Sequence, residues 1–92
     1  MPQIFKIGPY SVYFWSNEGN PLEPVHVHIA EGRPYQNATK IWLTSGGSAV
    51  ICGNASKIPE KLLLRLIRII EANSDEIIEA WKEHFGEIRF IR

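Results

Sequence analysis

The sequence predicts an α+β fold, in which an antiparallel sheet of four or five strands is packed on one face by a C-terminal helix or kinked helix pair. Two observations carry this prediction. Over residues 1–53, short runs rich in apolar residues are separated by glycine and proline, which is typical of strands and turns. Over residues 56–86 the apolar period changes to about 3.6, which is typical of an amphipathic helix. With 92 residues the chain is expected to form a single domain, so any site on it must be shallow or shared.

The strand-rich half contains five expected strands. The first two form a hairpin across Gly8-Pro9, and the second of them is apolar on both faces, which places it centrally in the sheet. A polar loop over residues 16–24 precedes the third strand, and a turn at Ser45-Gly46-Gly47 joins the last two. The expected strands are residues 4–7, 10–15, 25–31, 38–43 and 48–52.

The helical half is expected to begin near Ser56, which is a candidate N-cap, with Pro59 in the first turn. At Asn73 either two helices meet or one long helix bends, and Asn73 with the acid three residues later resembles a capping box. Gly86 is expected to end the helix. Residues 87–91 are open to a short final strand.

The overall charge and the lone cysteine argue against several classes of function. Ten basic and ten acidic residues cancel, which argues against a protein whose whole surface attracts nucleic acid. Cys52 lies in an apolar run and is interpreted as a buried, reduced thiol, so neither a disulfide framework nor a cysteine-rich zinc motif is expected. The chain shows no signal peptide and no run of membrane-spanning length, and we expect it in the cytoplasm.

The segment Val25-His26-Val27-His28-Ile29 is the part of the sequence that looks most like a chemical site. Side chains alternate along a strand, so His26 and His28 project from one face, about 6–7 Å apart at their Cα atoms. A divalent metal such as zinc is one hypothesis, and it requires a third ligand. Glu18 and Glu23 are the nearest candidates, and His84 is more remote. The alternative is that both histidines lie on a solvated face or hydrogen-bond the loop backbone and hold the loop in place.

Lys40 and Trp42 share one face of the fourth expected strand. If Ile41 and Leu43 pack under the helix, Lys40 and Trp42 lie beside the two histidines, on a surface suited to a peptide or a phosphate. The alternative is that Trp42 only covers part of the sheet. The candidate ligand-binding residues are therefore His26, His28, Asn17, Glu18, Glu23, Lys40 and Trp42.

The first part of the helical half is basic and the second part is acidic. In one continuous helix this order opposes the helix macrodipole, so the basic end is a candidate surface for an acidic partner or a phosphate backbone. Two separate helices would remove the conflict, because Asp75 and Glu76 would then lie at the start of the second helix. Leu64 projects among the cations as an exposed apolar side chain. The candidate partner contacts are Leu64, Lys61, Arg65 and Arg68.

Four segments together resemble domain-of-unknown-function family 4160: Phe14-Trp15-Ser16-Asn17-Glu18, Glu23-Pro24-Val25-His26-Val27-His28, Lys40-Ile41-Trp42-Leu43, and Ala80-Trp81-Lys82-Glu83-His84-Phe85-Gly86. The resemblance implies a small bacterial protein, often encoded beside a member of family 2442 and suggested to belong to a toxin–antitoxin pair.

Two functions remain open from the sequence. The preferred hypothesis is a small binding module, one half of a toxin–antitoxin-like pair, that acts through contact with a protein encoded by a neighbouring gene of the family 2442 kind. A homodimer through an exposed strand edge is a further option, nucleic acid has weaker support, and no membrane partner is expected. The alternative function is a metal-assisted hydrolase or nuclease that uses His26 and His28.

Overall fold

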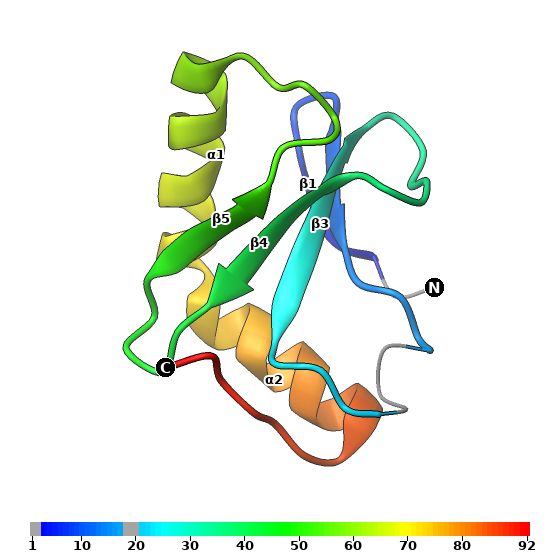
Figure 1. The fold of residues 1–92 in the computed structure, drawn as a ribbon, viewed down its shortest axis with the longest axis vertical. Coiled ribbons are helices and arrows are strands. Elements are labelled where there is room, and N and C mark those ends of the chain that lie inside the picture. Colours follow the sequence, from blue (N-terminus) through cyan, green and yellow to red (C-terminus); the bar gives the residue numbers. More distant parts are fainter. Residues whose placement is uncertain (1–2, 18–20) are drawn as a thin grey trace.

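The computed structural model describes residues 3–17 and 21–92 and confirms the α+β class. The five strands form one antiparallel sheet and follow one another in chain order from one edge to the other. Figure 1 shows the sheet in front of the helices. All five expected strands are present, with small shifts in their bounds. They are β1 Gln3–Ile7, β2 Tyr10–Tyr13, β3 His26–Glu31, β4 Thr39–Leu43 and β5 Ala49–Gly53.

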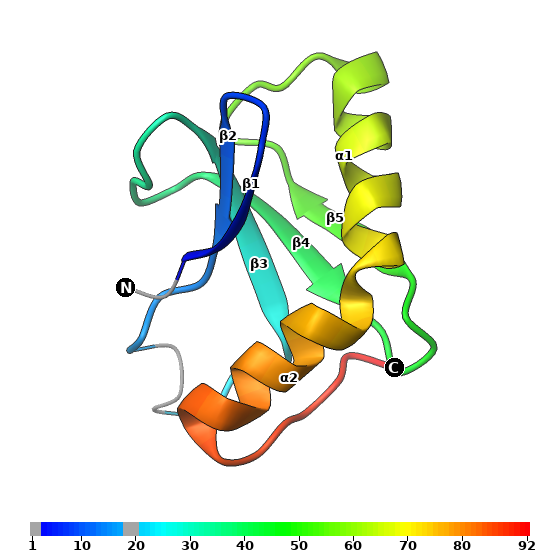
Figure 2. The same cartoon turned by 180° about the vertical axis from the view of Figure 1, so that it is seen from behind.

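Two helices follow the sheet, α1 over Glu60–Ala72 and α2 over Ser74–Phe85. They meet at Asn73, so the structure contains two helices rather than one bent helix. Figure 2 shows both helices on the same side of the sheet, with α1 near the β5 edge and α2 crossing at the end where β3 begins. Gly86 ends α2 with a left-handed φ of 78°, as the sequence predicted.

The main core lies between the helices and one face of the sheet. The inward residues of α1 and α2 are leucine, isoleucine and tryptophan, and they pack on alternate residues of the strands. The other face carries no helix within residues 3–17 and 21–92. The fully or nearly buried core residues include Val12, Val27, Ile29, Ile41, Leu43, Leu63, Leu66, Ile70, Ile77 and Trp81.

The predicted cap at Ser56 is wrong, whereas Asn73 does occupy the N-cap position of α2 but without the predicted side-chain hydrogen bond. Pro59 occupies the position before α1. The Ser56 hydroxyl instead donates to the Ile29 carbonyl at 2.9 Å and accepts the Thr39 N–H at 2.9 Å, so it joins β3 and β4. Asn73 makes no side-chain cap for α2, because its amide donates to the Ile69 carbonyl of α1 at 2.8 Å. With a single residue between the helices, the Asn73 side chain serves the end of the first one.

The prediction that β2 lies inside the sheet is confirmed. It is an interior strand between β1 and β3, with β3 as the middle strand. It is buried on both faces, because the β3–β4 loop covers the face without helices. The Ser11 hydroxyl donates to the Gly32 carbonyl at 2.6 Å, and the Tyr13 hydroxyl donates to the Tyr35 carbonyl at 2.7 Å.

Cys52 and the C-terminal residues also depart from expectation. Cys52 is a free but exposed thiol, because β5 is an edge strand that α1 covers on one side only. Residues 87–91 form no strand. The C-terminal segment is instead held by single backbone bonds next to the strands, from the Val25 N–H just before β3 to the Arg89 carbonyl and from the Ser45 N–H just after β4 to the Arg92 carbonyl. Neither described helix is long and apolar enough to cross a membrane.

Candidate binding surfaces

The two histidines of β3 lie on the face of the sheet that carries no helix. His26 is paired across the strands with Trp42, and His28 with Lys40 on one side and Tyr13 on the other. The predicted neighbourhood of imidazole, cation and indole is therefore present. It results from the strand register alone, because residues opposite each other in antiparallel strands share a face.

The surroundings of His26 indicate a structural role for this side chain. Its side chain is fully buried, and its ring packs edge-on against Trp42, Trp81 and His28, with centroid separations of 5.4, 5.2 and 5.0 Å. Nδ1 lies 2.9 Å from the Pro24 carbonyl oxygen. A carbonyl only accepts hydrogen bonds, so this nitrogen carries the proton. The interpretation that a histidine anchors the loop backbone is therefore confirmed for His26.

His28 lies nearer the solvent than His26 does and forms part of the wall of a pocket. Its side chain is buried apart from a small exposed part, and its ring lies 5.5 Å from that of Tyr13. The pocket has a volume of about 560 Å³ and is bounded by the ends of the β2–β3 and β3–β4 loops. Its lining residues are Trp15, Ser16, Asn17, His28, Gln36 and Asn37. We refer to it as the His28 pocket.

Sequence analysis identified two of these lining residues, His28 and Asn17, and missed the others. Gln36 and Asn37 belong to a loop far along the chain, and the pocket forms only when that loop folds over β2. A weak signal was present at Asn37, whose φ is 61°. Asparagine is one of the few residues that adopt this left-handed conformation readily, so it marks a sharp turn in the loop.

Glu23, Lys40 and Trp42 form a second cluster on the same face. Lys40 Nζ donates to Glu23 Oε1 at 3.0 Å and lies 4.3 Å from the centroid of the Trp42 ring. The ammonium group is thus held by a carboxylate and an aromatic face together. Both charged side chains are partly exposed, so the pair is a modest contribution to stability. The ion pair with Lys40 also engages the carboxylate of Glu23, which was a candidate metal ligand.

A metal site at the two histidines lacks a third ligand in the described part of the chain. Within residues 3–17 and 21–92, no three His, Cys, Asp or Glu side chains come close enough together to hold an ion. His84 is on α2, where its ring packs against Phe14 and Phe85 at 5.6 and 4.7 Å. Glu18 lies outside the described residues. The zinc hypothesis therefore needs a ligand from there or from another molecule.

The third surface is the seam between α1 and β5. Leu64 on α1 is 49% exposed and Ile51 on β5 is 42% exposed. Glu71 accepts the Ala49 N–H at 2.9 Å, which turns that side of α1 toward the sheet edge. Leu64 is seven residues, or about two helical turns, before Glu71 and therefore lies on the same side. We call Ile51, Leu64, Lys61, Arg65 and Arg68 the α1–β5 surface.

The charges along the helices are explained in part by their division. Asp75 and Glu76 lie in the first turn of α2 and Lys82 in its last turn, which agrees with the dipole of that helix. The helix dipole does not explain the positions of the cations on α1 in the same way. Lys61, Arg65 and Arg68 are all exposed, and none of them forms an ion pair within the part of the chain that the structure describes.

Comparison with known proteins identifies a family but no activity. The family model described as a domain of unknown function, DUF4160, matches residues 10–82. The match spans β2 to most of α2 and so includes the His28 pocket and the α1–β5 surface. No curated protein and no solved structure matches the chain significantly.

Proposed function

The chain belongs to the DUF4160 family of domains of unknown function, and we propose that it is a small protein-binding module, one member of a bacterial toxin–antitoxin-like pair. The supporting observation is an exposed leucine, Leu64, that lies beside the edge strand of the sheet and among cations that form no ion pair with the residues the structure describes. A partner with an acidic, partly apolar surface fits this combination.

The energetic case starts from the two exposed apolar side chains. Burial of a fully exposed leucine or isoleucine is worth about 1.5–3 kcal/mol, and because Leu64 and Ile51 are already about half buried, each offers roughly half of that to an interface. β5 is an edge strand, and beyond Ala49, whose N–H is already bonded to Glu71, its outer main chain can pair with an extended segment of the partner. The cations of α1 would then attract acidic side chains and speed the encounter.

A second copy of the chain fits this surface less well than an acidic partner. Antiparallel pairing of β5 with β5 of another copy would continue the sheet and place both α1 helices on the same side. Lys61, Arg65 and Arg68 of the two copies would then approach one another. Like charges across an interface oppose association, so self-pairing carries a cost that an acidic partner avoids.

The expected partner is the product of the neighbouring gene, of the family 2442 kind. The test is co-expression of the two chains, followed by co-purification and a measurement of the dissociation constant. We expect a stable complex from the unaltered chain. Leu64→Asp should weaken it at least about tenfold, because it replaces a buried apolar contact with a desolvated charge.

Ile91→Asp is the matched control, because Ile91 is also an exposed apolar residue, at 37%, but lies in the C-terminal segment outside the α1–β5 surface. It should leave the affinity nearly unchanged. Equal losses from both variants would contradict the assignment of the surface. If the unaltered chain did not bind the product of the neighbouring gene at micromolar concentrations, the proposed function itself would be contradicted.

The alternative of a metal-assisted hydrolase or nuclease gains no support from the described residues. His26 is fully buried and engaged with Pro24, and Glu23 is engaged with Lys40. An active site would need an accessible ligand set, so we give the binding module preference.

A further inference from the structure

We propose that the His28 pocket binds a purine base, presented either by a free nucleoside or by an unpaired base of RNA. This site is separate from the α1–β5 surface and does not depend on the function proposed above. Its volume of about 560 Å³ lies within the range of about 300–1,000 Å³ that small-molecule sites occupy.

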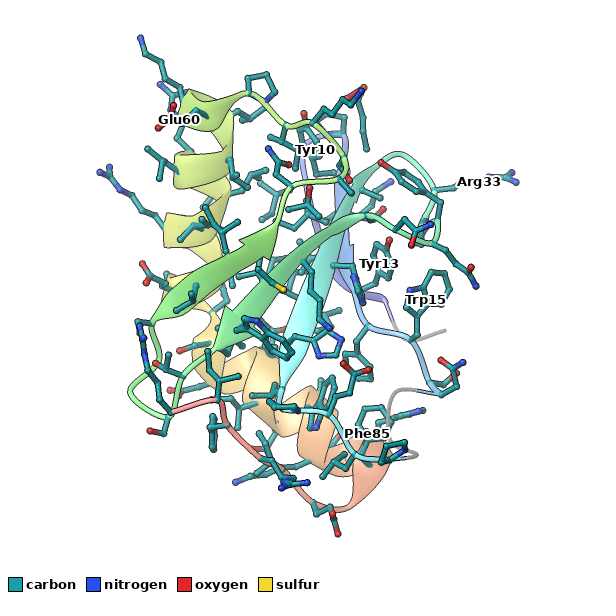
Figure 3. All side chains as sticks on the ribbon, viewed as in Figure 1. Tyr10, Tyr13, Trp15, Arg33, Glu60 and Phe85 are labelled. Atoms are coloured by element: carbon teal, nitrogen blue, oxygen red, sulfur yellow. The ribbon has the colours of Figure 1, made fainter. Side chains whose placement is uncertain are left out.

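The described residues that line the pocket are polar and carry no fixed charge. They supply an indole, an imidazole, a hydroxyl and three carboxamides, and none of them is a carboxylate, lysine or arginine. Lys40 is held by Glu23 outside the lining, and Arg33 projects away from the β3–β4 loop into solvent (Figure 3). The pocket is therefore suited to a neutral polar ring rather than to a phosphate or a metal ion.

Trp15 supplies a flat apolar wall. Its ring is half-buried and stands nearly perpendicular to that of Tyr13, with centroids 5.3 Å apart and an interplanar angle of 78°. Figure 3 shows these two side chains next to each other on the face without helices. Tyr13 is itself anchored to the Tyr35 carbonyl, so the indole rests on a fixed neighbour. A fixed indole favours stacking with a base, which binds to aromatic side chains through its π-face.

The carboxamides supply the hydrogen-bonding edge. Asn17, Gln36 and Asn37 are exposed, and none of their side chains is bonded to another group within residues 3–17 and 21–92. Each carboxamide offers a donor beside an acceptor. Adenine presents the complementary pair at its N6 and N7 atoms, and asparagine and glutamine bind this edge through two hydrogen bonds. A stacking wall combined with amide edges favours adenine over a pyrimidine.

The test is a titration of the full chain, labelled with ¹⁵N, with adenosine, followed by NMR. We expect saturable shifts of the Trp15 indole N–H and of the side-chain amides of Asn17, Gln36 and Asn37. Cytidine should bind more weakly, and methyl glucoside should cause no shift. Shifts elsewhere on the protein, preference for the glucoside, or no shift at millimolar adenosine would overturn the proposal.

Variants separate the two parts of the pocket. Trp15→Ala should weaken adenosine binding roughly 5–100-fold, which corresponds to the loss of one stacking contact. Asn37→Gly removes one carboxamide while keeping the left-handed backbone, and it should weaken binding several-fold without unfolding the chain. Gln36→Ala should act similarly. Arg33→Gln and Leu64→Asp are controls outside the pocket and should leave adenosine binding unchanged. Unchanged affinity in both Gln36→Ala and Asn37→Gly would contradict the amide edge.

A comparison of adenosine with oligoadenylate distinguishes the two sources of the base. Equal affinity per base that is insensitive to salt identifies a nucleoside site. Tighter binding of the oligomer that weakens steeply as salt is raised identifies an RNA base, because phosphate contacts release counterions. Either result supports the purine site, whereas binding of oligoadenylate that persists unchanged in Trp15→Ala would overturn it.

Discussion

The two faces of the sheet are buried in different ways. The face toward α1 and α2 is covered by aliphatic side chains and helices, whereas the opposite face is covered by loops and by rings of histidine, tyrosine and tryptophan. The middle strand shows the contrast directly, because Val27 and Ile29 face the helices, His28 faces the loops, and His26 bonds the loop backbone while its ring also reaches Trp81 at the α2 end of the sheet. These four residues of the strand are all buried. Burial alone therefore does not distinguish a structural face from a functional one.

The difference lies in how the polar groups are satisfied. Aliphatic packing on the helix side is non-directional and tolerates small shifts. On the loop side each buried polar group needs a partner, and the Ser11, Tyr13 and His26 side chains find it in loop carbonyls. These bonds fix the loops at defined positions over the sheet. The loop side of the sheet therefore buries less apolar surface than the helix side and forms a pocket of defined shape.

The first and largest effect is expected on the helix side. Leu66→Ala should lower the free energy of unfolding by about 2–5 kcal/mol, because Leu66 is only 1% exposed and its removal leaves a cavity. Leu64→Ala is a matched control on the same helix, with a 49% exposed side chain, and should change the stability by less than about 0.5 kcal/mol. Urea denaturation monitored by circular dichroism gives both values. Equal losses would mean that the helix-side core is not where the structure places it.

The strands and their facing residues could be predicted from the sequence because they depend on local periodicity. The alternation around His26 and His28 assigned their face, and the same rule placed Lys40 and Trp42 beside them. Cys52 shows the limit of this reasoning. An apolar run identifies a strand but not whether it lies at an edge, and only the edge position of β5 exposes the thiol.

The pocket could be predicted only in part. His28 and Asn17 stood out by residue type and position, but Gln36 and Asn37 look like ordinary loop residues until the β3–β4 loop folds over β2. Ser56 was misassigned for the same reason. Its hydroxyl had a local role available as a helix cap, and tertiary hydrogen bonds to β3 and β4 took precedence. Long-range contacts of polar side chains produce no periodic pattern in the sequence from which they could be predicted.

A smaller effect is expected on the loop side. Tyr13→Phe removes the hydroxyl that bonds the Tyr35 carbonyl and should lower the free energy of unfolding by about 1 kcal/mol. It should also weaken adenosine binding, because the β3–β4 loop loses an anchor. Tyr35→Phe is the control, since the Tyr35 hydroxyl bonds Ser56 at an exposed position and its loss should cost less. If Tyr13→Phe were as stable as the parent chain, the loop would not be held by this bond.

The smallest expected effect concerns a titratable group within the helix-side core. Tyr10 is only 7% exposed, and burial, followed by the charge of Glu31 opposite it on β3, raises the pKa of its hydroxyl above the usual 10.0. Above pH 10 the unfolded chain releases this proton more readily than the folded one, so the stability that Tyr10 contributes decreases as the pH rises. Urea denaturation across the alkaline range should show this decrease. Tyr10→Phe should reduce it, and Glu31→Gln should reduce it by a smaller amount, because only the secondary cause is removed. A steeper decrease in Tyr10→Phe than in the parent chain would contradict the raised pKa of Tyr10 and, with it, the placement of this side chain in the helix-side core.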